Sequence, residues 1–143
     1  MKFLLVFATF LAAALMMTGA GTPAVSYVDH DKVAASLAKG GTLVTQSDLT
    51  VMGSHREKAG QVELHEKETD VFYVTDGEAT IVTGGKMIGG KQKSAGQMLG
   101  TSIEGGEAHH LSKGDVMVIP AGTPHWFKEV PKSISYYVVK VIR

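Results

Sequence analysis

Three side chains that can bind a metal ion or move a proton lie close together in this sequence: Glu63, His65 and Asp70. Glu63 and His65 are separated by one residue in a predicted strand, so both side chains point to the same face. The polar run after His65 is typical of a turn, and Asp70 then opens the next predicted strand. A hairpin of this kind would return Asp70 beside His65 and gather three donor groups on neighbouring strands.

A fourth candidate, His125, lies much further along the chain. It follows a turn, an apolar strand and a second tight turn that contains Pro120 and Pro124. Proline fixes its own φ and restricts the residue before it, so the chain reaches His125 in a stiff conformation. Because a preorganised ligand needs such stiffness, we predict that His125 is a metal ligand.

His55 is an alternative ligand. It alternates with Val51 and Gly53 in a predicted strand, so these three residues share one face. If that face lines the interior, His55 supplies an imidazole to the site and Arg56 faces solvent.

The composition limits the chemistry. The chain has 143 residues and no cysteine, which excludes disulfides, thiolate catalysis and cysteine-ligated zinc. Lys and Arg together number 14, as do Asp and Glu, so the formal charge is zero. Because there is also no long basic run, the sequence argues against a nucleic-acid partner.

Residues 1–24 have the features of a signal peptide. Lys2 is followed by an uncharged, mostly apolar stretch and then by small residues at two candidate cleavage sites. The stretch is shorter than a membrane span needs, although an uncleaved anchor is the alternative. We predict export to the periplasm or medium, no membrane attachment after cleavage, and one mature domain at 25–143.

The rest of the chain is mostly β. One helix is predicted at 29–39, capped by Asp29 and ended by Gly40 and Gly41. Strands are predicted at 42–45, 49–56, 61–65, 71–75, 79–83, 108–111, 116–119, 125–130 and 133–142. Asp76 and Gly77 are predicted to form a turn, and the glycine-rich stretch 84–106 to be a long loop, either a lid or a mobile hairpin. Such a pattern is typical of an all-β sandwich or barrel.

Over about residues 42–142 the chain resembles the cupin superfamily, whose members carry two short motifs. Glycines, a histidine and carboxylates match the first motif, at Gly60, Glu63, His65, Asp70 and Gly77. The second motif is matched step by step from its glycine to its histidine, at Gly114, Pro120, Gly122, His125 and Glu129.

The resemblance implies a double-stranded jelly-roll β-barrel, here with a short N-terminal helix. It also implies a divalent metal at the barrel centre, held by Glu63, His65, Asp70 and His125. The chain departs from the family pattern at Glu63, which replaces the first histidine, at Asp70, which replaces a glutamate, and at Glu129, which replaces an asparagine. Two imidazoles and two carboxylates suit zinc, iron, manganese or nickel.

The function expected from this resemblance is a metal-dependent enzyme of the dioxygenase or isomerase class that acts on a small molecule. Glu63 or Glu129 would then be the general base. Two alternatives use the same fold: a non-catalytic module that binds a small molecule, and a metal-free structural barrel. Because cupins often pair through edge strands, the resemblance also leaves a homodimer open.

Overall fold

The computed structural model describes residues 24–143, and helix α1 (His30–Lys39) is the first element. The Asp29 side chain caps α1 by accepting a hydrogen bond from the Lys32 backbone N–H at 3.1 Å. Gly40, at φ 79°, ends it, because residues with a side chain rarely adopt such a φ. The predicted helix is therefore confirmed. Apart from Ala24, the predicted signal peptide lies outside the described residues.

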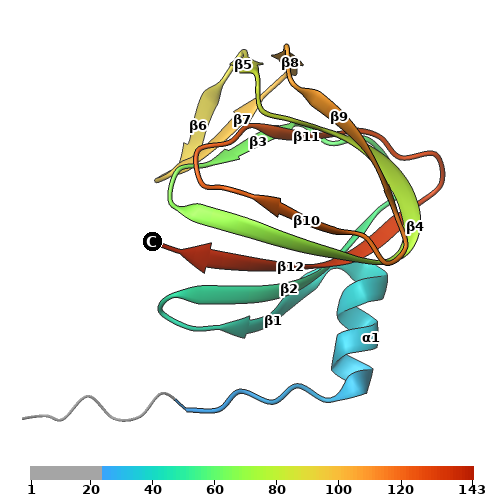
Figure 1. Cartoon of the computed structure of the whole chain (residues 1–143). Coiled ribbons are helices and arrows are strands. Elements are labelled where there is room, and N and C mark those ends of the chain that lie inside the picture. Colours follow the sequence, from blue (N-terminus) through green and yellow to red (C-terminus); the bar gives the residue numbers. More distant parts are fainter. Residues whose placement is uncertain (1–23) are drawn as a thin grey trace, which may run out of the picture.

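Twelve strands follow α1 within the described part of the chain (Figure 1). They are β1 (Gly41–Thr45), β2 (Leu49–Arg56), β3 (Val62–His65), β4 (Glu68–Thr83), β5 (Lys86–Ile88), β6 (Lys91–Ser94), β7 (Gln97–Gly100), β8 (Ser102–Glu104), β9 (Glu107–Ser112), β10 (Val116–Ile119), β11 (His125–Glu129) and β12 (Ile134–Ile142).

The strands form two antiparallel sheets that share β4. The first sheet has the order β1-β2-β12-β4-β10, and the second has the order β6-β7-β3-β11-β4-β9. The sheets curl around a common interior, with α1 against the outside of β2 and the short β5–β8 ribbon at the opposite end (Figure 1). This is the jelly-roll architecture that the sequence predicts.

One strand, β4, replaces the two strands and the turn that were predicted between 71 and 83. Its first half pairs with β10 and β12, and its second half pairs with β9 and β11. A register shift against β12 marks a bulge before Gly77, which has φ 75°. The bulge bends the strand from one sheet into the other, so the predicted turn is wrong and the glycine marks a corner of the barrel.

Replacing Gly77 by alanine should destabilise the fold by about 3 kcal/mol, because a Cβ there meets two penalties. The alanine residue would have to keep a positive φ, and its Cβ would lie 2.0 Å from the Ser133 carbonyl oxygen. Gly84 is the matched control, since it has φ 73° but no atom within 4 Å of the added Cβ. Gly84→Ala should cost only about 1 kcal/mol. Urea denaturation measures both, and equal losses would contradict this account of the corner.

The stretch 84–106 is not a long loop. It contains β5, β6, β7 and β8, and β7 pairs with β3 in the second sheet. Many of its glycines lie in tight turns before, between and after these short strands, and six of them have positive φ: Gly84, Gly85, Gly89, Gly96, Gly105 and Gly106. The stretch therefore builds a wall of the barrel.

The hydrophobic core fills one end of the interior. Its buried members are Phe72, Val74, Ala79, Ile81, Leu111, Ile119, Phe127, Ile134, Tyr136 and Val138. The rings of Phe72, Phe127 and Tyr136 pack with centroids 5.1 to 5.9 Å apart. Asp70 shares the inward side of β4 with Phe72, so a polar layer lies directly beyond these rings.

Candidate metal centre

Four of the predicted ligands converge inside the barrel. Glu63 and His65 come from β3, Asp70 from β4, and His125 from the start of β11, where it lies opposite Glu63. The His65 and His125 ring centroids are 5.1 Å apart. One oxygen of Asp70, Oδ2, lies 3.4 Å from His65 Nε2 and 3.7 Å from His125 Nε2. Glu63 Oε2 lies 3.7 Å from His65 Nε2.

The second nitrogen of each imidazole is fixed by a neighbouring oxygen. His125 Nδ1 donates to the Thr123 carbonyl oxygen at 3.2 Å, and His65 Nδ1 donates to the Gln97 side-chain carbonyl. A carbonyl oxygen can only accept, so Nδ1 carries the proton in both rings. In a neutral imidazole this leaves a lone pair on Nε2, which is the arrangement found in metal-binding histidines.

These lone pairs face carboxylate oxygens. His65 Nε2 is fully buried and has no hydrogen-bond partner among the described residues, although Asp70 and Glu63 lie next to it. Acceptors that surround one buried point without a donor repel each other unless a cation lies between them. The donor set therefore fits a divalent ion, which could be held by Glu63, His65, Asp70 and His125.

Two overlapping groups of ligand atoms meet the distance expected for a shared ion. Glu63, His65 and His125 form one group, and His65, Glu68 and Asp70 form the other, with all ligand atoms of each group within 4.8 Å of one another. Glu68 was not predicted. It lies two residues before Asp70 in β4, a spacing that puts both side chains on the same face.

Cations on β2 and β12 hold the carboxylates in place. Lys140 Nζ lies 2.8 Å from Asp70 Oδ1 and 3.1 Å from Glu68 Oε2. Arg56 Nη2 donates to Glu63 Oε1 at 3.0 Å. Each carboxylate therefore has one oxygen paired with a cation, and Asp70 and Glu63 turn the other toward the histidines.

The pKa shifts of Glu63, Glu68 and His125 favour the charged form of these two carboxylates and the neutral form of the His125 imidazole. Burial alone would raise the pKa of Glu63, but Arg56 and the nearby histidines more than offset this and lower it below 4.5. Lys140 overcomes the burial of Glu68 in the same way and lowers its pKa. Burial lowers the pKa of His125 below 6.5, despite the Thr123 carbonyl and the Asp70 carboxylate. This protonation pattern is the one that metal binding requires.

The metal-free protein should therefore lose stability in acid in two stages. The pKa of His125 is lower in the folded protein than its ordinary value of 6.5. Its stabilising contribution is therefore complete above pH 6.5 and is lost as the pH falls through the folded-state pKa. The lowered pKa values of Glu63 and Glu68 add a second loss below 4.5. Urea denaturation in EDTA across this range measures both. His125→Gln, which does not titrate, should lack the first stage, and a first stage that persists would contradict the assignment.

Two predicted residues lie elsewhere. His55 Nδ1 contacts the Ser135 hydroxyl at 2.8 Å, and His55 belongs to neither ligand group. The interior side of β2 is instead the one that carries Ser54 and Arg56. The predicted inward face of this strand is therefore wrong, and Arg56 is half-buried at the site instead of facing solvent.

Glu129 is exposed and likewise lies outside both groups. Alternation from the buried His125 and Phe127 would turn Glu129 inward. A register shift in β11 intervenes, because Phe127 pairs with Ile81 whereas Glu129 pairs with the next residue, Thr80. This bulge reverses the side of the strand on which Glu129 lies. It is therefore not placed to be a general base at this site.

Sequence reasoning also missed Lys140. Alternation in the last strand contained the signal, since Ile134, Tyr136 and Val138 are buried and Lys140 continues the same side. A lysine at the end of an inward-facing apolar row needs a buried carboxylate as a partner, and Asp70 is that partner.

Two hollows meet at the candidate centre. The inner cavity, of about 150 Å³, is lined by Met52, Ser54, Arg56, Glu63, Asp70, Phe72, His125, Phe127, Tyr136, Val138 and Lys140. The outer cleft, of about 350 Å³, is lined by Arg56, Gln61, Glu63, His65, Lys93, Ser94, Gln97 and Leu99. The ligand atoms lie between a smaller hollow and a larger, more polar one, so the site has room for a small molecule.

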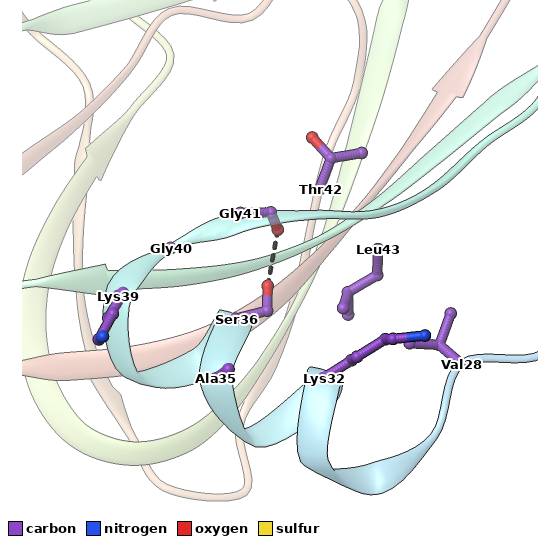
Figure 2. Close-up of a pocket in the computed structure, with 9 residues that line it drawn as sticks. All are labelled: Val28, Lys32, Ala35, Ser36, Lys39, Gly40, Gly41, Thr42 and Leu43. Carbon is purple, nitrogen blue, oxygen red and sulfur yellow. Dashed lines mark hydrogen bonds between the residues drawn. The ribbon is translucent and has the colours of Figure 1, made fainter.

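A third hollow lies between α1 and β1, away from these residues. Figure 2 shows Ser36 pointing toward Gly41, whose carbonyl oxygen accepts its hydroxyl hydrogen bond at 2.7 Å. The same hydroxyl oxygen accepts from the Gly53 N–H at 3.0 Å. This hollow contains no carboxylate or imidazole, so its chemistry is that of helix packing.

The chain folds as an antiparallel jelly-roll barrel, and imidazoles and carboxylates lie together in its interior. This combination of fold and site defines the class of this protein. The family model described as Cupin matches residues 37–141, and the chain belongs to this family. No sequence among the curated proteins matches the chain.

Solved structures agree with the fold. BH2720 from Bacillus halodurans matches with a TM-score of 0.57 at 16% identity, over 82% of this chain and 81% of that one. KdgF from Halomonas sp. matches with a TM-score of 0.53 at 19% identity, over 73% and 79%. The DMSP lyase DddQ from Ruegeria pomeroyi DSS-3 matches with a TM-score of 0.52 at 14% identity, over 72% and 46%. At these identities the likeness extends to the fold alone.

Proposed function

We propose that the chain is a cupin that binds one divalent metal ion in its barrel and uses it to act on a small molecule. The observation that carries this proposal is the pair of buried imidazoles whose Nε2 atoms lie 3.4 and 3.7 Å from the same Asp70 oxygen. When bound, the ion would supply a Lewis acid to a substrate in the adjoining hollows. The structurally similar DddQ is a DMSP lyase, which supports a reaction on a small molecule in a barrel of this fold.

The chain's own residues would position the reacting groups. Gln97 and the Thr123 carbonyl hold the two rings in one orientation. Arg56 occupies Glu63 Oε1 and leaves Oε2 directed toward His65, where it can bind the ion or accept a proton. Phe72 and Phe127 give the inner cavity an apolar wall.

Metal analysis of untagged protein tests the proposal. Protein stripped with EDTA should take up one zinc or manganese ion per chain, and the manganese form should relax bulk water protons through an exchangeable water ligand. An ion that gives no such relaxation would indicate a closed, structural site. Failure to bind any of zinc, iron, manganese or nickel would overturn the metal proposal and leave a metal-free barrel.

A non-catalytic binding module is the second candidate, because the hollows at the site would serve it equally well. A small molecule that raises the melting temperature of the metal-loaded protein and is recovered unchanged would favour this candidate.

We also propose that the chain is exported and that it self-associates. The apolar stretch after Lys2 supports export. N-terminal sequencing of the protein from the periplasm or medium tests it. Tyr73, Val116 and Val118 support self-association, since they lie on neighbouring strands and are 47%, 64% and 57% exposed. Light scattering tests the proposed self-association.

A further inference from the structure

Arg56 lies at the boundary between the inner cavity and the outer cleft, and only Glu63 lines both hollows with it. A ligand that extends from the outer cleft toward the inner cavity would therefore lie beside the guanidinium and the Glu63 carboxylate. The Arg56 side chain is 27% exposed, so its charge is partly removed from water but still accessible.

The guanidinium is held rigidly by three neighbours. Its Nε donates to the Tyr136 hydroxyl at 2.9 Å, and its Nη2 donates to Glu63 at 3.0 Å. Its Cζ lies 4.7 Å from the centroid of the Phe127 ring, within the range of a cation–π contact. An arginine fixed in this way loses little further conformational entropy when it binds a ligand.

Part of the donor capacity of Arg56 is unused. A guanidinium has five N–H groups, and the two hydrogen bonds above use one on Nε and one on Nη2. Nη1 donates to no described residue, and it lies beside Gly60, where an added Cβ would be only 2.7 Å away. Free N–H groups on a partly buried cation are the chemistry that binds a carboxylate.

The residues that line the outer cleft also favour the binding of an anion. Lys93 adds a second positive charge, and Gln61, Ser94 and Gln97 add neutral polar groups. Among the described residues that line this cleft, Glu63 carries the only carboxylate, and Arg56 already pairs with it. The cleft therefore attracts a negatively charged, polar molecule.

We propose that the outer cleft binds a small polar molecule through its carboxylate and that Arg56 is the residue that recognises this group. This inference rests on the proposed function, because the remainder of the molecule would then reach the metal position beyond Arg56. The substrate class would be small hydroxylated carboxylates, with Lys93 attracting the anion and Arg56 orienting it.

Binding to metal-stripped protein tests this inference apart from the metal itself. Gluconate and sorbitol are matched probes, since they share a hydroxylated six-carbon chain and differ in the carboxylate. Gluconate should shift the amide resonances of residues in the outer cleft, such as Gln61 and Ser94, and sorbitol should not. Equal effects of the two probes, or no effect of gluconate, would overturn the inference. Inorganic phosphate is the third arm, and binding of phosphate alone would overturn the assignment to carboxylates.

Two variants test whether gluconate binds through the Arg56 guanidinium. Arg56→Met should weaken gluconate binding by about tenfold or more, because it removes a charge-assisted contact. Gly60→Ala keeps the charge but crowds Nη1, and should weaken binding by about threefold or more while preserving the fold.

Lys128→Met is the matched control, since Lys128 is an exposed cation that lies over Trp126 and lines neither hollow. It should leave gluconate binding unchanged. If Arg56→Met does not fold, Gly60→Ala decides alone, and unchanged gluconate binding in that variant would overturn the inference. A metal titration of the same samples is independent of this result, so failure of the metal proposal is recognised separately.

Discussion

Replacing His125 by alanine should weaken zinc binding by more than about a hundredfold, which exceeds the effect of losing a residue that only supports a ligand. His125 supplies a buried Nε2 whose lone pair is set by the Nδ1 hydrogen bond to Thr123. Alanine removes this ligand, and no other histidine belongs to the two ligand groups except His65. His65→Ala should therefore have an effect of similar size. Titration of metal-stripped protein against a competing zinc chelator measures both.

His55→Ala is the control for these variants. His55 is also partly buried in a strand, but its ring contacts Ser135 and Glu57 rather than the candidate centre. Zinc affinity should not change when it is replaced. A loss as large as that of His125→Ala would mean that the first-motif imidazole comes from β2 after all, and the assignment of Glu63 would then be wrong.

Replacing Lys140 by methionine should destabilise the metal-free protein by about 3 kcal/mol. Asp70 is only 2% exposed, and Lys140 Nζ is its cationic partner at 2.8 Å. Methionine fills most of the same volume but leaves Asp70 and Glu68 without this charge. A buried carboxylate that loses its partner retains its full desolvation cost, which is the source of the expected loss.

Metal should reverse most of this loss, since a divalent ion beside Asp70 supplies the missing positive charge. Zinc should therefore raise the melting temperature of Lys140→Met more than that of the unaltered protein. Lys128→Met is the control, because Lys128 is exposed and pairs with no described carboxylate. Thermal unfolding with EDTA and with zinc gives all the comparisons. A Lys140→Met protein as stable as the control without metal would contradict the role assigned to Lys140.

The fold could be predicted because most strands are recognisable from their own residues and from the turn residues that flank them. The bounds of β2 and β10 agree with the sequence prediction, and helix α1 has a local cap and stop. The corner at Gly77 was missed because a glycine with positive φ serves a turn and a bulge equally well. Which of the two forms depends on β12, which pairs with both sides of the bend and lies far away in the sequence.

The candidate site could be predicted where side-chain alternation holds and not where it fails. Glu63 and His65 face one interior, as their spacing indicates, and Asp70 returns beside them. His55 was placed on the wrong side because both faces of β2 carry apolar residues, so alternation there does not identify the inner one. Glu129 was misplaced by a bulge that only its pairing with β4 reveals. Arg56 and Gln97 support the site through contacts with other strands, which alternation along one strand does not reveal, whereas alternation in β12 did contain the signal for Lys140.

The most direct test of the metal centre is the anomalous scattering of a zinc-loaded crystal, measured above and below the zinc absorption edge. The account predicts one strong difference peak inside the barrel, about 2.0 to 2.1 Å from both His65 Nε2 and His125 Nε2. A barrel interior without a peak, or a peak at surface histidines such as His109 and His110 instead, would contradict it.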